Sequence, residues 1–145
     1  MLKLRKNKKG FTLVELIVVI AIMAVLAGTV AGVTVSQLNK RTDEANHTQA
    51  KKIADTIYEE LLANVETGIT AANMKAAVEE AYGTSIISDS LTAGKTFKVT
   101  YAENSETGTY SVEYKGKQSG GNGDIKYTIT STEGVKKEAN YKAGN

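Results

Sequence analysis

The pattern of hydrophobic and polar positions divides the chain into three parts. The first part is apolar, and from Phe11 to Val35 its only ionisable side chain is Glu15. This stretch of 25 residues exceeds the roughly 20 that a helix needs to cross a membrane core. Five basic residues precede it, which predicts a cytoplasmic N-terminus and an outward-facing C-terminal part. We therefore expect a basic leader over residues 1–10 and a membrane segment over residues 11–35.

The second part has the period of an amphipathic helix. Its apolar residues fall on or near one face, in the order Leu38, Ala45, Ile53, Ile57, Leu61 and Val65. The charged residues of the other faces are Lys40, Arg41, Asp43, Glu44, Lys51, Lys52, Asp55, Glu59 and Glu60. The pattern predicts that the helix continues to about residue 66 and reaches about 80 Å in length. Its first half would be exposed, and its second half would pack a globular head.

The third part follows a second helix, predicted over residues 70–82 and closed by Gly83. After it the period changes to two, as in half-buried strands, around residues 97–101, 110–114 and 125–129. These segments predict an antiparallel meander over about residues 96–134, to which residues 135–141 add a short fourth strand. A long helix against three to four strands gives an α+β fold, with residues 36–145 forming the head.

The net charge hides a difference between the leader and the rest of the chain. The formal charge is +2, but 13 basic residues face 16 acidic ones once the leader is set aside, which leaves −3. Nucleic-acid binding rests on clustered Lys and Arg, so direct binding to nucleic acid is not expected. Because the chain has no cysteine, no disulfide can stabilise the head.

Residues suited to catalysis or metal binding are few. His47 is the only histidine and is predicted to be exposed, and Glu59 and Glu60 are helix neighbours that point in different directions. The segment "SGGNGD" is glycine-rich, but no helix follows it to bind phosphate, so we interpret it as a hairpin loop. Most tyrosines fit core positions, and Tyr141 is the best surface candidate. We expect no enzyme activity, no metal site and no cofactor.

Glu15 is the anomaly of the apolar run. A charged side chain at the centre of a membrane helix costs about 2.5–3.5 kcal/mol on insertion scales. An ordinary secretory signal, cut before Gly28, would explain the basic and apolar regions. A plain single-pass anchor would explain the length and the orientation. Neither of these alternatives accounts for the acid.

The stretch "KKGFTLVELIVVIAIMAVLAG" resembles the class III signal of type IV pilins and pseudopilins. The resemblance lies in a basic leader that ends in Gly10, followed by Phe11, Thr-Leu and Glu15, and then an apolar helix. It implies that a membrane-embedded prepilin peptidase cuts between Gly10 and Phe11 and methylates the new amine of Phe11. It also implies an assembly ATPase and a membrane platform protein as partners.

The resemblance further implies roles for residues inside the apolar helix. Glu15 would neutralise the amine of an adjacent subunit as a filament grows, so it would act as an assembly charge. Ala24, Gly28 and Gly32 form a stripe of small residues along which helices can pack closely. Many pilins carry a proline late in this segment, whereas this chain has none, so Gly28 and Gly32 are candidates for a weak point.

The resulting hypothesis is a major structural subunit of a type IV pilus. The precursor would span the cytoplasmic membrane once, and the mature chain would polymerise into a surface filament for adhesion, twitching motility, biofilm formation or DNA uptake. A pseudopilin of a type II secretion or competence system is the first alternative. A membrane-anchored or secreted binding module is the second. The absence of disulfides in an exposed head points to a Gram-positive or anaerobic source.

Overall fold

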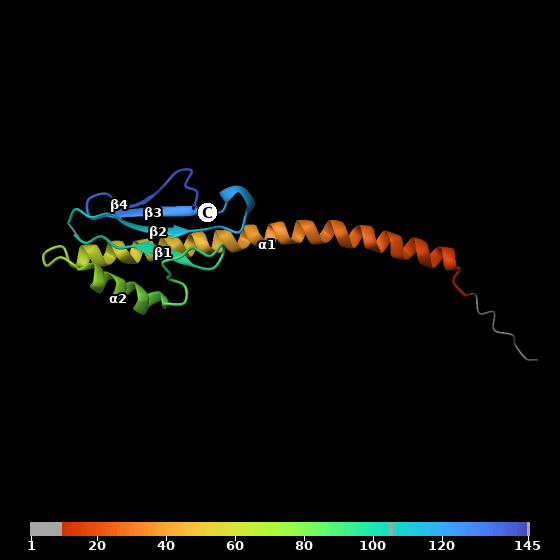
Figure 1. The fold of residues 1–145 in the computed structure, drawn as a ribbon, viewed down its shortest axis with the longest axis horizontal. Coiled ribbons are helices and arrows are strands. Elements are labelled where there is room, and N and C mark those ends of the chain that lie inside the picture. Colours follow the sequence, from red (N-terminus) through yellow and green to blue (C-terminus); the bar gives the residue numbers. More distant parts are fainter. Residues whose placement is uncertain (1–9, 105, 145) are drawn as a thin grey trace, which may run out of the picture. The chain divides into compact units, whose positions relative to one another are not determined.

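The computed structural model describes residues 10–104 and 106–144. The chain divides into two compact units, Met1–Ser36 and Gln37–Asn145, and we call the second unit the head. Helix α1 (Leu13–Ala63) runs through both units, while α2 (Ala71–Tyr82) and four strands belong to the head (Figure 1). The α+β class predicted from the sequence is confirmed.

Helix α1 has two halves with different surroundings. Its apolar residues before Gln37 are all exposed, from Phe11 just ahead of the helix to Val35. Within the head, one face of α1 is buried, and its buried residues are Asp43, Ala50, Ile53, Ala54, Ile57 and Leu61. These positions are separated by one, three, four or seven residues, so they form the stripe along which a helix buries one side.

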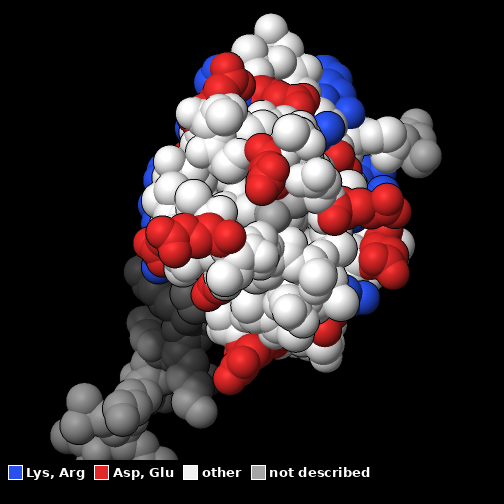
Figure 2. All heavy atoms as spheres, turned by 90° about the vertical axis from the view of Figure 1, so that its left-hand side faces the viewer, with Lys and Arg blue, Asp and Glu red and all other residues white. Residues whose placement is uncertain are grey.

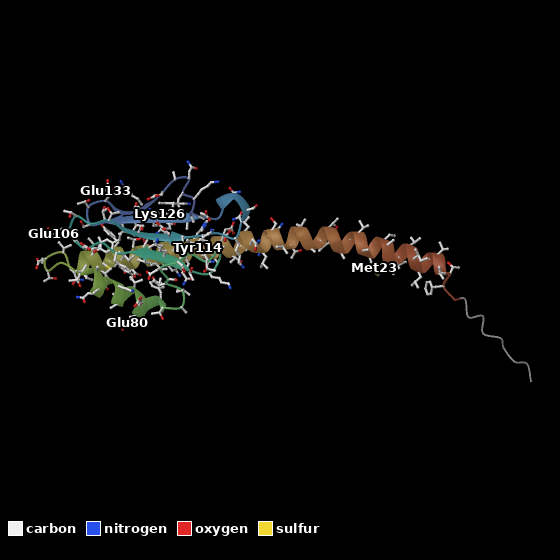
Figure 3. The ribbon with its side chains drawn as sticks, in the orientation of Figure 1. Met23, Glu80, Glu106, Tyr114, Lys126 and Glu133 are labelled. Carbon is white, nitrogen blue, oxygen red and sulfur yellow. The ribbon has the colours of Figure 1, made fainter. Side chains whose placement is uncertain are left out.

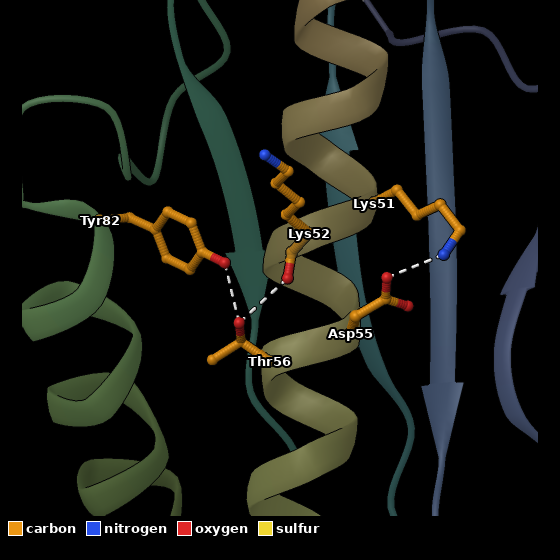
Figure 4. A network of polar contacts seen from close by, with 5 residues as sticks. All are labelled: Lys51, Lys52, Asp55, Thr56 and Tyr82. Atoms are coloured by element: carbon orange, nitrogen blue, oxygen red, sulfur yellow. Dashed lines mark hydrogen bonds and ion pairs between the residues drawn. The ribbon is translucent and has the colours of Figure 1, made fainter.

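The helices meet through polar as well as apolar contacts. The Thr56 Oγ1 atom lies 2.8 Å from the hydroxyl of Tyr82 and donates to the carbonyl of Lys52 at 3.0 Å (Figure 4). Met74 and Val78 of α2 are fully buried in the same core. Thr70 caps α2 by accepting from the Asn73 amide, and Gly83 ends it with φ 81°.

The sheet is an antiparallel meander in the order β1-β2-β3-β4. Its strands are β1 (Phe97–Thr100), β2 (Tyr110–Tyr114), β3 (Ile125–Thr130) and β4 (Gly134–Lys137). Phe97 pairs with Tyr114, and Val112 pairs with Tyr127, so apolar residues face each other across neighbouring strands. Tyr110 and Tyr114 are fully buried, which places the alternating face of β2 in the core.

Several positions differ from the sequence pattern. Asp43, expected on a charged face, is completely buried, because it bonds to a loop of the head. Leu38 and Val65, expected on the apolar face, are each 61% exposed, since the buried stripe of α1 begins at Asp43 and ends at Leu61. Helix α1 ends at Ala63 rather than near residue 66, and β4 is shorter than residues 135–141.

Other differences concern exposed or half-buried residues. Ala45, expected on the apolar face of the long helix, is exposed. His47 and Tyr141, expected at the surface, are half-buried, and Lys126 Nζ lies 5.6 Å from the centre of the Tyr141 ring. The expected hairpin loop "SGGNGD" contains a short 3-10 turn at Ser119–Gly121. Some of these residues are covered by segments that are distant in the sequence, and others have no segment packed over them. Local periodicity does not predict either situation.

Candidate processing and assembly site

The start of α1 is closed by a reciprocal pair of hydrogen bonds. The Thr12 amide donates to the Glu15 carboxylate at 2.9 Å, and the Glu15 amide donates to Thr12 Oγ1 at 3.3 Å. This is a capping box, in which a Thr at the N-cap and a Glu three residues later satisfy amides that lack helical partners. The stretch "TLVE" ahead of an apolar run is the sequence signature of this box, a signal in addition to the apolar period and the basic leader.

The capping box explains why an acid is tolerated at this place in the chain. Glu15 lies in the first turn of α1, where the positive end of the helix dipole favours a negative charge. Its carboxylate is bonded to the amide of Thr12, the residue that follows Phe11. The backbone nitrogen of Phe11 thus belongs to the residue directly before the one whose amide binds this carboxylate.

The bond between Gly10 and Phe11 lies outside the helix. Phe11 is 92% exposed, and α1 begins at Leu13. A Cβ atom added at Gly10 would meet no described atom within 4 Å, and the backbone there does not have a positive φ. Nothing among the described residues requires glycine at this position.

The first half of α1 presents a continuous apolar surface. By length and composition α1 can cross a membrane, and none of its most apolar window of 18 residues is buried. Thr29 and Thr34 interrupt the apolar run, but their hydroxyls donate to the carbonyls of Leu26 and Val30. Their polar groups are thus satisfied inside the helix, as an apolar environment requires.

The stripe of small residues does not contact other elements within the described chain. An added Cβ at Gly28 or Gly32 would meet nothing within 4 Å, and the helix is unbroken through both residues. Ala24 lies one turn earlier and is also exposed. Packing of other helices along Ala24, Gly28 and Gly32 therefore stays a prediction, as does a weak point at the two glycines.

A second constellation lies in the head, around Asp43. Its Oδ1 atom accepts hydrogen bonds from the Tyr114 hydroxyl and the Lys117 amide, both at 2.8 Å. Its Oδ2 atom accepts from the amide and the side-chain Nε2 of Gln118, both at 3.1 Å. One carboxylate of α1 thus holds the connection between β2 and β3. The neighbouring Asn46 donates to the Tyr114 hydroxyl at 2.9 Å and completes the network.

These contacts shift the pKa of Asp43. Burial alone would raise the pKa of this carboxyl, but the hydrogen bonds from Lys117, Tyr114 and Gln118 favour its charged form. The net result is a pKa below its ordinary value of 3.8. Burial, together with the bond to Asp43, raises the pKa of Tyr114. Asp43 is therefore a charged group that the fold uses as a hydrogen-bond acceptor.

The glycine-rich connection is shaped by the same carboxylate. A Cβ at Gly123 would collide with the Asp43 side chain, and one at Gly116 would collide with the backbone of Gly123. The Gly123 carbonyl also lies 2.6 Å from His47 Nε2. Gly116 allows close approach of two backbone segments of the loop, and Gly123 allows "SGGNGD" to pack against Asp43 and His47 of α1. Among residues 10–104 and 106–144, no three His, Cys, Asp or Glu side chains are grouped to hold a metal ion.

Comparisons with known proteins bear on the N-terminal constellation alone. No curated protein and no solved structure matches the chain. A family motif does match, and it covers the second part of the leader, the Gly10–Phe11 bond, the capping box and the first part of the apolar helix. Residues 5–31 match the prokaryotic N-terminal methylation motif, so the chain carries the class III signal peptide motif of type IV pilins.

Proposed function

We propose that this chain is the precursor of the major structural subunit of a type IV pilus. One observation carries the proposal, namely the fully exposed apolar half of α1 directly behind the matched motif. Exposed apolar surface of this extent marks a membrane or protein contact. A helix that first lies in lipid and later packs against copies of itself would use this surface twice. The motif belongs to structural subunits and not to a class of enzymes.

Processing is the first step of the proposed mechanism. A membrane-embedded prepilin peptidase cuts between Gly10 and Phe11 on the cytoplasmic side and methylates the amine of Phe11. The absence of a structural need for glycine at position 10 supports a requirement set by the peptidase. Cutting removes the five basic residues of the leader, which anchor this end at the anionic inner leaflet. The helix is then free to leave the membrane.

Assembly is the second step. The new amine of Phe11 is largely protonated at neutral pH, because α-amino groups have pKa values of about 7.7–8.0. The Glu15 carboxylate, held in its own capping box before assembly, pairs with the amine of an adjacent subunit. Such a pair in an apolar filament core sets the axial register more than it adds net stability, because desolvation offsets much of the attraction.

The proposal includes partners and a location. Copies of the chain form a helical homopolymer, with Ala24, Gly28 and Gly32 on the helix face that packs closely. An assembly ATPase and a membrane platform protein draw subunits from the cytoplasmic membrane into an extracellular filament. Adhesion, twitching motility, biofilm formation and DNA uptake are the activities that such a filament would support.

The first experiment identifies the N-terminal peptide of the mature protein from its native cell by mass spectrometry. The proposal expects a chain that begins at Phe11 and carries one methyl group on its amine. A start at Gly28 would indicate a discarded secretory signal, and an intact start would indicate a plain anchor.

Gly10→Leu should leave an uncut precursor, whereas Gly28→Ala serves as the control that is still processed.

The second experiment separates assembly from processing. Glu15→Gln should be cut and methylated as in the wild type but should yield few or no surface filaments. Glu44→Gln removes an exposed charge elsewhere on α1 and should leave filament yield unchanged. Normal filaments from Glu15→Gln would contradict the role of Glu15 in assembly. A mature chain that forms no long filaments, but is needed for protein secretion, would favour the pseudopilin alternative.

A further inference from the structure

One end of the head is basic. We call it the entry end, because α1 enters the head there. Asp43, Asn46 and His47 bond here to the loops around Gly94, Lys117 and Gly123. The basic residues of this end are Lys40, Arg41, Lys95, Lys115, Lys117 and Lys142, and they outnumber Glu44, an exposed acid of the same stretch of α1. Within the described residues none of these six makes an ion pair, and the nearby Asp43 and Asp124 carboxylates accept hydrogen bonds from backbone amides.

The opposite end of the head, which we call the far end, is acidic. Here α1 terminates beside the connections between β1 and β2 and between β3 and β4, as the contact of Ser131 Oγ with the Glu106 carbonyl shows. Glu106 and Glu133 lie at this end, away from Tyr114 (Figure 3). Its acidic residues are Glu59, Glu60, Glu66, Glu103, Glu106 and Glu133. Of these six, only Glu133 has an ion pair in the part of the chain that is described, with Lys136 at 2.9 Å.

The acids at the far end are not there to stabilise α1. The negative end of a helix dipole lies at its C-terminus, where acidic residues are unfavourable and basic residues are favourable. The last turn of α1 contains no basic residue, while Glu59, Glu60 and Glu66 lie in or just after it. A departure from local preference without a compensating contact often marks a functional surface.

The far end also has a pocket with a mixed polar and apolar lining. Leu61, Asn64, Val65, Glu106 and Ser131 line this pocket of about 260 Å³. Val65 in its lining and Leu62 next to Leu61 in the chain are half or more exposed. Figure 2 looks onto this end of the head and shows acidic side chains and uncharged surface over most of it, with basic side chains toward the edges of the view. Such a surface fits Lys and Arg side chains, which combine an apolar stem with a cationic tip.

We infer that the far end of one head docks onto the entry end of the head of a second copy of this chain. Charge complementarity selects this occupant, because six cations without an ion pair among the described residues lie at one end of every copy, and a pocket with acidic residues around it lies at the other. Arg41 and Lys40 of one copy then face Glu106 and Glu66 of the next. The inference rests on the proposed function and adds to it a contact between heads that is separate from the Glu15 pair.

The geometry of this contact suits a filament. Two different surfaces of the same chain meet, so each copy retains one free surface of each kind. Head-to-tail contacts of this type build open helical assemblies unless their rotation closes a ring. Opposite charges also steer copies into the correct direction, because a reversed copy would oppose like charges.

Charge reversal tests the inference in the full-length chain expressed in its native cell. The far-end variant is Glu106→Lys and the entry-end variant is Arg41→Glu. Each should lower the yield of sheared surface filaments at least about tenfold. The double variant restores opposite charges across every contact and should recover most of the yield. Controls with the same charge changes are Glu80→Lys on α2 and Lys137→Glu on β4, both exposed and without ion pairs among the described residues.

The possible outcomes separate the inference from the proposed function. Wild-type yield from both single variants, or single-variant losses that the double variant does not recover, would overturn the contact between heads. Failure of the wild type itself to form filaments would overturn the proposed function instead. Mass spectrometry of each variant checks that the chain starts at Phe11, so a loss of filaments is not mistaken for a loss of processing. Wild-type filaments should also dissociate more readily at high salt. The screening length is about 8 Å at physiological ionic strength and becomes shorter as salt is added, so opposite charges at the contact attract each other less.

Discussion

The two halves of α1 use similar residues for opposite purposes. Ile17, Ile20 and Ile22 are each more than half exposed, whereas Ile53 and Ile57 on the same helix are fully buried. The helix itself is continuous, so the difference is one of surroundings. The second half stabilises the head by removing its apolar face from water. The first half has no such partner among the described residues, and we propose that lipid and then other subunits supply one.

The acids of α1 repeat this contrast. Asp43 is fully buried and accepts four hydrogen bonds from three residues of the head. Glu15 is exposed, and its hydrogen bonds to other described side chains or N-terminal amides are those of its own capping box. One carboxylate is committed to the fold of the chain. The Glu15 carboxylate accepts a local hydrogen bond from the Thr12 amide and can exchange it for a partner from outside the chain.

The largest expected effect compares two isoleucines of α1. Ile57→Ala should lower the free energy of unfolding of the head by about 2–5 kcal/mol, because it leaves a cavity in a close-packed core. Ile20→Ala, the matched control, should leave head stability unchanged. Denaturant unfolding of the full chain in detergent, followed by tyrosine fluorescence, measures both. Equal losses from the two variants would mean that the first half of α1 also stabilises the head.

The next comparison concerns Asp43 and its neighbour Glu44. Asp43→Asn should cost about 1.5–3 kcal/mol, since it removes charge-assisted hydrogen bonds and turns an amide group toward the donors of Lys117 and Gln118. Glu44→Gln alters an exposed acid and should have little effect. The same unfolding measurement applies. An Asp43→Asn chain as stable as the wild type would show that the loop is held by other contacts.

The pH dependence of head stability should follow from Asp43. The pKa of Asp43 is lowered in the folded head. Its contribution to the stability of the head is therefore present above the unfolded pKa of 3.8 and is lost as the pH falls through the folded pKa. The stability difference between the wild type and Asp43→Asn should therefore shrink below about pH 4. A difference that stays constant down to the acid transition would contradict this assignment.

The smallest effect is expected at the start of α1. Thr12→Val removes the side-chain half of the capping box and should weaken the first turn by about 1 kcal/mol. Thr29→Val, which removes a hydroxyl bonded to Leu26 further along the helix, is the matched control. Hydrogen exchange of amides 13–16 in detergent should quicken for Thr12→Val alone, with the head unaffected. Unchanged exchange would indicate that Glu15 is held by something other than the capping box.

The sequence predicted the elements well where one periodicity dominates. The long helix, the second helix and the three strands around residues 97–129 all follow from apolar spacing, because each element must bury one face. The motif around Gly10, Phe11 and Glu15 was also recognised from a short contiguous stretch, and the methylation motif confirms it. Leu38 and Val65 mark the limit, since periodicity does not tell how far along a helix the head extends.

Contacts between distant segments were beyond the sequence. Nothing local distinguishes Asp43 from Glu44, yet the fold brings Tyr114, Lys117 and Gln118 to the first of them. The separation of charge between the two ends of the head arises in the same way. Cations and acids scattered through the sequence gather at opposite ends only when the sheet and α1 are assembled.

What the sequence by itself determined is the apolar helix, its basic leader and the order of elements, because hydrophobic period and local capping depend on neighbouring residues. What only the tertiary structure decided is which polar groups are buried and which charges share a surface. Those properties depend on residues about 70 positions apart, such as Asp43 and Tyr114, and a carboxylate becomes a stable buried acceptor only when the fold supplies its donors.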